Sequence, residues 1–177
     1  MRRRTALIVT LCSSSALIGG CAGLNSLTSL TPPVADYTAA SVFSPAGYSQ
    51  TKIDDTHFQV EASGTEATPK DRVEKIARAR AAEIGVDEKM KFFKVTSVQH
   101  STTCGKRKEG YKTTTTPPSA HPSVVLDVVY AKDTADPTFQ NSADTLATLK
   151  TDLAAEAVAP EARAVAIQET RESCTKG

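Results

Sequence analysis

The chain has 177 residues, of which 40% are hydrophobic, 23% are charged and only 5% are aromatic, with no tryptophan. This composition predicts one globular domain with a tether and excludes an intrinsically disordered chain. The formal net charge is +1 and no long basic stripe occurs, so we expect no nucleic-acid partner.

Residues 1–20 are typical of a bacterial lipoprotein signal peptide. A basic start, Arg2 to Arg4, precedes a short apolar run that ends in Gly19 and Gly20, directly before Cys21. Such a signal is cut before the cysteine, whose thiol then carries a diacylglycerol. The run Cys12-Ser13-Ser14-Ser15 interrupts the apolar stretch, which argues against a membrane span of about 20 residues. An ordinary secretory signal with a chance cysteine is the alternative.

An acylated Cys21 predicts where the protein resides. Burial of acyl chains contributes about 0.8 kcal/mol per CH₂, so two or three chains hold a protein firmly on a bilayer. Ala22 follows the cysteine, at a position where an aspartate would favour the inner membrane. We therefore expect the periplasmic face of the outer membrane, with the inner membrane as the less favoured location. Loss of the three arginines with the signal leaves a slightly negative mature chain.

The next segments predict a tether and the start of the fold. Residues 21–45 are rich in Ser, Thr, Ala and Pro and predict a flexible tether. Strands are expected over 48–53 and 57–62, the second because Phe58, Val60 and Ala62 alternate with polar residues. A helix is expected from Thr68, as its capping residue, to a stop at Gly85.

The second half of the chain repeats this pattern. Strands are expected over 91–98 and 124–131, separated by an irregular Thr/Pro-rich loop over 101–122. A helix is expected over 142–157, capped by Ser142 or Asn141, followed by a weaker helical stretch over 161–172. The order β-β-α-β-β-α predicts an α+β fold, a small antiparallel sheet with helices packed on one face. The globular domain would cover 46–159, with a C-terminal helical tail over 160–177.

Cys104 and Cys174 remain when the signal is removed and Cys21 is acylated. An even pair in an oxidising compartment predicts a disulfide, and two free thiols are the alternative. A metal site is less favoured, because no CxxC motif occurs and the histidines are scattered. These histidines are His57, His100 and His121. We expect neither a metal nor another cofactor.

One group of charged residues suggests a site. Arg80 lies on the apolar stripe of the first helix, where an unpaired charge would be costly, and Glu83 follows three residues later. Arg80 either lines a pocket for an anionic ligand or, as we favour, forms a structural ion pair with Glu83 or Asp127. Asp127 itself is either an acid in a cleft or, as we favour, a solvent-facing residue of a one-sided sheet.

Several of these residues form a recognisable series. Gly47-Tyr48-Ser49 opens the first strand, Gly64 follows the second, Arg80-Ala81-Ala82-Glu83 lies in the helix, and a Phe follows at 92 or 93. The series, over about Gly47 to Val98 and with the lipid signal, resembles a family of uncharacterised proteobacterial lipoproteins of the Caulobacter type. The chain departs from that family at Glu88 to Lys91, where a Gly-aromatic turn is usual. The resemblance implies a lipoprotein of unassigned activity and supplies no catalytic residues.

These observations favour a non-enzymatic accessory or interaction module, held on the bilayer through Cys21 and docking an envelope protein. The sequence contains no GxSxG, HExxH or phosphate-loop motif. The alternative is a periplasmic small-ligand-binding protein or a hydrolase with a pocket between sheet and helices. A deep pocket with convergent polar groups near Arg80 and Asp127 would favour that alternative.

Overall fold

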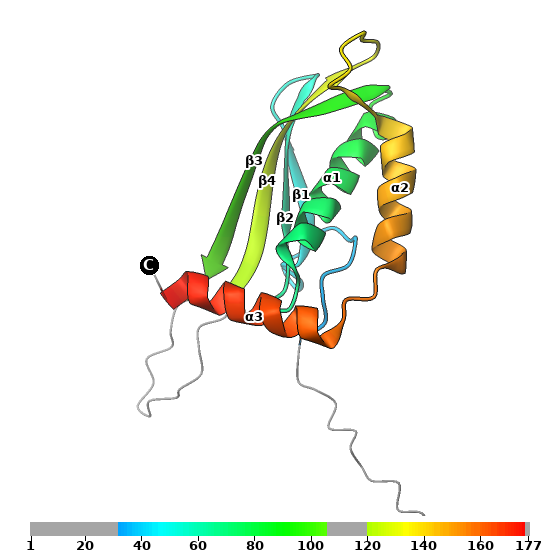
Figure 1. Ribbon diagram of the computed structural model, residues 1–177. Helices are drawn as coiled ribbons and strands as arrows, with labels where there is room; N and C mark the ends of the chain where they lie inside the picture. Colours follow the sequence, from blue (N-terminus) through cyan, green and yellow to red (C-terminus); the bar gives the residue numbers. More distant parts are fainter. Residues whose placement is uncertain (1–31, 106–119, 176–177) are drawn as a thin grey trace, which may run out of the picture. The chain divides into compact units, whose positions relative to one another are not determined.

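A five-stranded antiparallel sheet and three helices make up the part of the chain that this computed structural model describes, residues 32–105 and 120–175 (Figure 1). The strands are β1 (Gly47–Lys52), β2 (His57–Ser63), β3 (Phe92–Cys104), β4 (Ala120–Ala131) and β5 (Gln140–Asn141), and the helices are α1 (Lys70–Asp87), α2 (Ser142–Ala155) and α3 (Pro160–Thr175). The predicted α+β class and order of elements are confirmed, with the two-residue strand β5 as an addition. The signal peptide, Cys21 and most of the predicted 101–122 loop lie outside the described residues.

The sheet has the strand order β1-β2-β4-β3-β5, and every neighbouring pair is antiparallel. Alternation in β2 places Phe58 and Val60 opposite Val128 and Leu126 of β4, and all four side chains are buried. The central strand β4 and its neighbour β3 extend to Ala120 and Cys104, well into the segment predicted as a loop. The second half of β3 is polar and has no apolar alternation of its own. It forms a strand because it pairs with β4.

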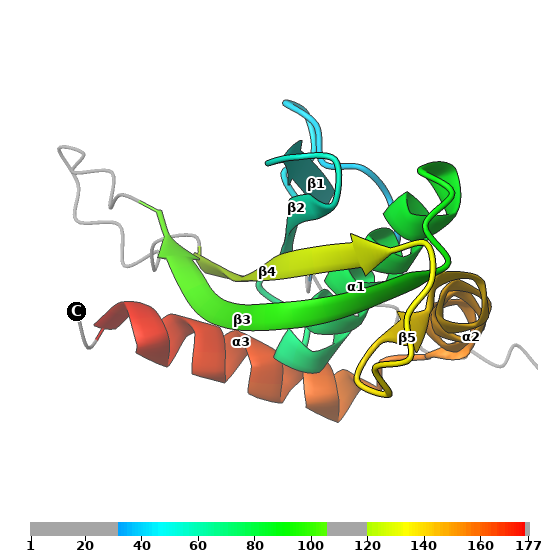
Figure 2. The same cartoon turned by 90° about the horizontal axis from the view of Figure 1, so that it is seen from above.

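The helices cover one face of this sheet, as predicted (Figures 1 and 2). Helix α1 packs against β2 and β4, with Val73, Ile76 and Ala77 at most 2% exposed, and α2 lies beside α1. The buried Tyr130 hydroxyl donates to the carbonyl of Ala81 at 2.8 Å and joins β4 to α1. Helix α3 packs against β3 and β4, so the expected helical tail belongs to the folded unit.

The fold begins before the boundary expected at residue 46. Ala35 is 3% exposed, and the backbone amide of Ala40 donates to the carbonyl of Tyr48 at 2.8 Å. The Tyr48 amide in turn donates to the carbonyl of Thr38 at 2.9 Å. Residues 35–40 of the expected tether therefore lie against α1 and β1. The sequence did not indicate this because the segment is held by hydrogen bonds and by the single large ring of Tyr37, which give no apolar periodicity.

The predicted start of α1 also differs in its capping residue. Pro69 occupies the N-cap position, with no side-chain cap. The hydroxyl of Thr68 instead accepts hydrogen bonds from the amides of Ala35 and Thr65, each at 2.9 Å. Thr68 thus holds residues 35–40, here called the N-terminal segment, through Ala35. Its prediction as a helix cap was wrong.

The predicted stop at Gly85 was wrong as well. The helix continues to Asp87 and turns at Lys89, whose φ of 58° is left-handed, while the amide of Met90 donates to the carbonyl of Gly85 at 2.7 Å. Gly85 is buried, and a Cβ there would overlap the side chain of Ser142. The glycine therefore allows the close approach of α1 to the start of α2. At that start the Asn141 side chain accepts from the amide of Asp144 at 3.1 Å, which confirms Asn141 as the cap.

Candidate functional site

A cluster of charged and aromatic side chains joins the N-terminal segment, α1 and α2. The carboxylate of Glu83 accepts from the Tyr37 hydroxyl at 2.7 Å, from the Arg80 guanidinium at 2.5 Å and from the Lys150 ammonium at 2.7 Å. These four residues are called the Glu83 cluster. The suggested pair of Arg80 and Glu83 is therefore present, and it is the centre of a larger network.

The network keeps Glu83 ionised. Burial raises the pKa of its carboxyl group, but the hydrogen bonds from Lys150, Tyr37 and Arg80 outweigh this and lower the pKa to about 2. Burial, with the hydrogen bond to Glu83, raises the pKa of Tyr37 above its usual range. Burial lowers the pKa of Arg80, yet its hydrogen bond to Glu83 and the charge of Glu83 raise that pKa on balance.

Arg80 has further partners that fix its position. Its side chain is 16% exposed, its Nε donates to the Gln50 side chain at 3.2 Å, and its guanidinium lies 5.2 Å from the ring centroid of Tyr48. The rings of Tyr48 and Tyr37 lie 4.9 Å apart. The cluster thus ties strand β1 to the same group of elements, and its polar groups are used for contacts within the fold.

Asp127 lies on the opposite face of the sheet from this cluster. Its neighbours in β4, Leu126 and Val128, are fully buried on the helix side, so strand alternation directs Asp127 to the other side. There its carboxylate accepts from the Gln59 side chain at 3.2 Å. The structure brings Arg80 and Glu83 together and separates both from Asp127, so the suggested pairing of Arg80 with Asp127 was wrong.

A second arginine, which the sequence analysis missed, is buried more deeply. Arg72 is 4% exposed, and its guanidinium donates to the carbonyl of Ala35 at 2.9 Å and to that of Leu153 at 3.3 Å. It also lies 3.3 Å from the Glu156 carboxylate and 3.6 Å from that of Asp36. The sequence did carry a signal for its burial: Arg72 stands four residues before the apolar Ile76, and residues at this spacing share one face of a helix.

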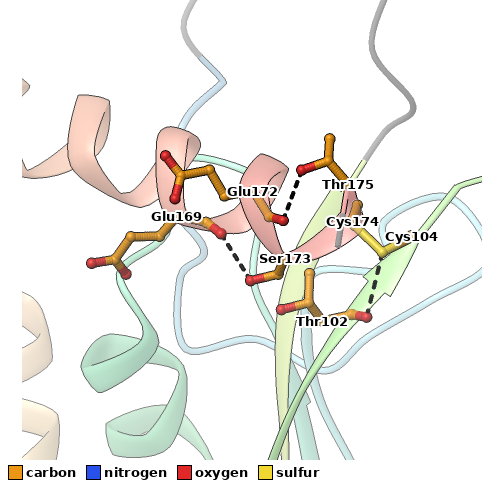
Figure 3. The surroundings of a disulfide bond; sticks show 7 residues. All are labelled: Thr102, Cys104, Glu169, Glu172, Ser173, Cys174 and Thr175. Carbon is orange, nitrogen blue, oxygen red and sulfur yellow. Dashed lines mark hydrogen bonds between the residues drawn. A yellow bond between two sulfur atoms is a disulfide. The ribbon is translucent and has the colours of Figure 1, made fainter. Parts of the chain in front are cut away.

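The two cysteines of the described chain lie at the end of β3 and in the last turn of α3 (Figure 3). Cys104 and Cys174 are at disulfide-bonding distance, with Cα atoms 5.6 Å apart. Close to them, Arg171 of α3 forms a double hydrogen bond with Glu66 at 2.6 and 2.9 Å. The pairing expected from the cysteine count is thus compatible with the fold.

The histidines do not converge. His100 lies 3.1 Å from the Glu74 carboxylate of α1, whereas His57 and His121 lie on β2 and β4. Over the ranges 32–105 and 120–175, no group of three or more His, Cys, Asp or Glu side chains could hold a metal ion. The structure therefore adds no candidate metal site to the described part of the chain.

Two surface hollows of the described chain are lined by none of the predicted site residues Arg80, Glu83 and Asp127. One of about 310 Å³ is lined by the end of α1 and the start of α2, and another of about 460 Å³ lies beside β1. Between α1 and the sheet, Val60, Ile76 and Leu126 are fully buried. Within the described ranges, none of the helices combines the length and the apolar character that crossing a bilayer requires.

Comparisons of the chain with protein families, with curated proteins and with solved structures find no match.

Proposed function

We propose that the chain is a lipid-anchored protein of the bacterial envelope whose folded domain is a non-enzymatic accessory or interaction module. The observation that carries the proposal is the placement of Cys104 and Cys174 at bonding distance, because paired cysteines persist in oxidising compartments. The basic start, the short apolar run and the small residues before Cys21 support the same compartment. Ala22 stands where an aspartate would favour the inner membrane, so the outer membrane is the default location.

The Glu83 cluster supports a structural rather than a catalytic use of its charges. A general base works best when its pKa lies near the operating pH, and the pKa of Glu83 is about 2. Three donors already occupy the carboxylate, among them Arg80 and Lys150. A substrate would have to displace contacts that hold the N-terminal segment, α1 and α2 together.

The sheet face that carries Asp127 is the surface we favour for a protein partner. Gln59 and Glu61 are exposed there, and Val125 and Val129 of β4 are half-buried beside them. Mixed polar and apolar side chains on an accessible sheet face suit a protein interface. The alternative, a ligand-binding protein or hydrolase, needs a cavity between sheet and helices, a region where side chains such as Val60 and Ile76 are fully buried.

Fractionation of the native host tests the proposal, with Cys21→Ser as the control. We expect the unaltered chain in the membrane fraction, with a first peptide whose mass includes a diacylglycerol on Cys21, and the variant in the soluble periplasm. In the membrane-bound protein, Cys104 and Cys174 should resist alkylation until a reductant is added. An unmodified Cys21 thiol in the native protein, or alkylation of the other two without reduction, would refute the proposal.

A further inference from the structure

Two large apolar side chains stand in solvent at the tip of a tight turn. Val42 is 92% exposed and Phe43 is 96% exposed, in the turn from Ser41 to Ser44 that precedes β1. Figure 2 shows this N-terminal segment, in blue, forming a loop beyond the edge strand β1. The two side chains are called the Val42–Phe43 tip. Adjacent apolar residues so fully exposed in one turn suggest a surface that is covered in use.

The two ends of the turn, Ser41 and Ser44, are hydrogen-bonded to each other. The amide of Ser41 donates to the carbonyl of Ser44 at 2.8 Å, and the amide of Ser44 donates back to the Ser41 carbonyl at 3.2 Å. The Ser41 hydroxyl also accepts from the Ser44 amide, at 3.1 Å. These bonds close the base of the turn and leave only the backbone groups of Val42 and Phe43 to be hydrated, which suits shallow insertion at the water-rich headgroup boundary.

The surroundings of the tip carry little charge. No residue from Tyr37 to Thr51 is charged, although Glu61 lines the hollow of about 460 Å³ that Val42 also lines. The flanking serines are polar but neutral. Neutral polar flanks around an apolar tip suit the interface of a bilayer, and the carboxylate of Glu61 favours zwitterionic over anionic lipid.

The tip is close in sequence to the expected anchor. Between Cys21 and the described fold lie residues 22–31, which span at most about 35 Å even when fully extended. A short connection of this kind raises the effective concentration of the bilayer near the domain, so that a weak contact becomes populated. The chain length outside the structure therefore points to lipid as the occupant.

We propose that the Val42–Phe43 tip inserts into the headgroup and acyl boundary of the membrane that holds Cys21. The inference rests on the proposed function and deepens it, because a second contact with the bilayer fixes the orientation of the domain. The lipid anchor alone would let the domain rotate freely. With the tip inserted, the β1 edge of the sheet faces the membrane.

The absence of tryptophan from the chain allows a direct test. The full acylated protein is reconstituted into phosphatidylcholine vesicles as Phe43→Trp and, for control, as Ile53→Trp, since Ile53 is 54% exposed at the opposite end of β1. We expect blue-shifted emission and quenching by brominated lipid for the tryptophan at 43, with neither effect at 53. In chains lacking the acyl group, Val42→Ser with Phe43→Ser should lower vesicle partitioning at least about tenfold.

Each outcome decides between insertion and its absence. In the acylated, vesicle-bound protein, unshifted and unquenched emission from position 43 would overturn the inference, and so would equal shifts at both positions. Crosslinking of the tip to a protein in native membranes, in place of lipid, would also overturn it. Mass spectrometry of the Cys21 peptide separately reports the anchor. If Cys21 were unmodified, the proposed function would fail. The emission shift of the tryptophan at position 43, measured with excess vesicles, would still decide whether the tip inserts.

Discussion

Replacing Glu83 by glutamine tests whether the Glu83 cluster holds the fold together. The substitution keeps the size of the side chain and removes the charge that Tyr37, Arg80 and Lys150 share. A pKa lowered from 4.5 to about 2 corresponds to about 3 kcal/mol of stability at neutral pH. Because Lys150 is nearly half exposed, solvent weakens its contact, and we expect Glu83→Gln to lower the free energy of unfolding by about 2 kcal/mol.

The same reasoning fixes the pH dependence of the effect. The pKa of Glu83 is lower in the folded chain than in the unfolded chain, so its contribution to stability is fully present above about pH 4.5. The contribution is lost as the pH falls through 4.5 toward 2, where both states become protonated. The difference between the unaltered protein and Glu83→Gln should therefore shrink steadily across that range.

Urea unfolding followed by far-ultraviolet circular dichroism, at several pH values from 7 to 2.5, measures this difference. Glu74→Gln is the control on the same helix: the Glu74 carboxylate pairs with Arg78 at 2.7 Å, four residues away, and lies 3.1 Å from His100. A helical pair four residues apart contributes about 0.5 kcal/mol, so the control should lose less than Glu83→Gln. Equal losses in the two variants, or a Glu83→Gln loss independent of pH, would refute the assigned role of Glu83.

Three further changes test other parts of the fold. Joint replacement of Cys104 and Cys174 by alanine should lower the free energy of unfolding by about 4 kcal/mol, because the disulfide would close a loop of 70 residues. A urea midpoint that does not change when the native protein is reduced would contradict this. Gly85→Ala should lower the free energy of unfolding by about 1–3 kcal/mol, because the added methyl group overlaps Ser142. Adding Ser142→Gly to that variant should restore part of the thermal stability, and no recovery would argue against the contact. Arg72→Ala should lower the free energy of unfolding by about 3 kcal/mol, because buried carbonyl groups lose their donor. Residues 35–40 should then become sensitive to protease. Continued resistance of that segment would show that Arg72 is not its main attachment.

Local patterns account for what the sequence alone determined. The alternation of Phe58, Val60 and Ala62 predicted both the strand and its buried face, because a sheet covered on one side buries every second residue. Asn141 was predicted as one of two caps, because its side chain bonds an amide only three residues away. The cysteine count suggested the pairing of Cys104 with Cys174 without any knowledge of the fold.

Contacts between distant segments decided the rest. The buried role of Arg72 depends on carbonyl groups 37 residues before it and 81 residues after it. The role of Gly85 follows from the start of α2, which packs against it. Arg80 and Asp127 are apart because Asp127 lies on the face of the sheet that the helices do not cover. Periodicity records which side of an element is buried, because burial follows the local geometry of the backbone. It does not record which element lies opposite, because that choice depends on packing of the whole chain.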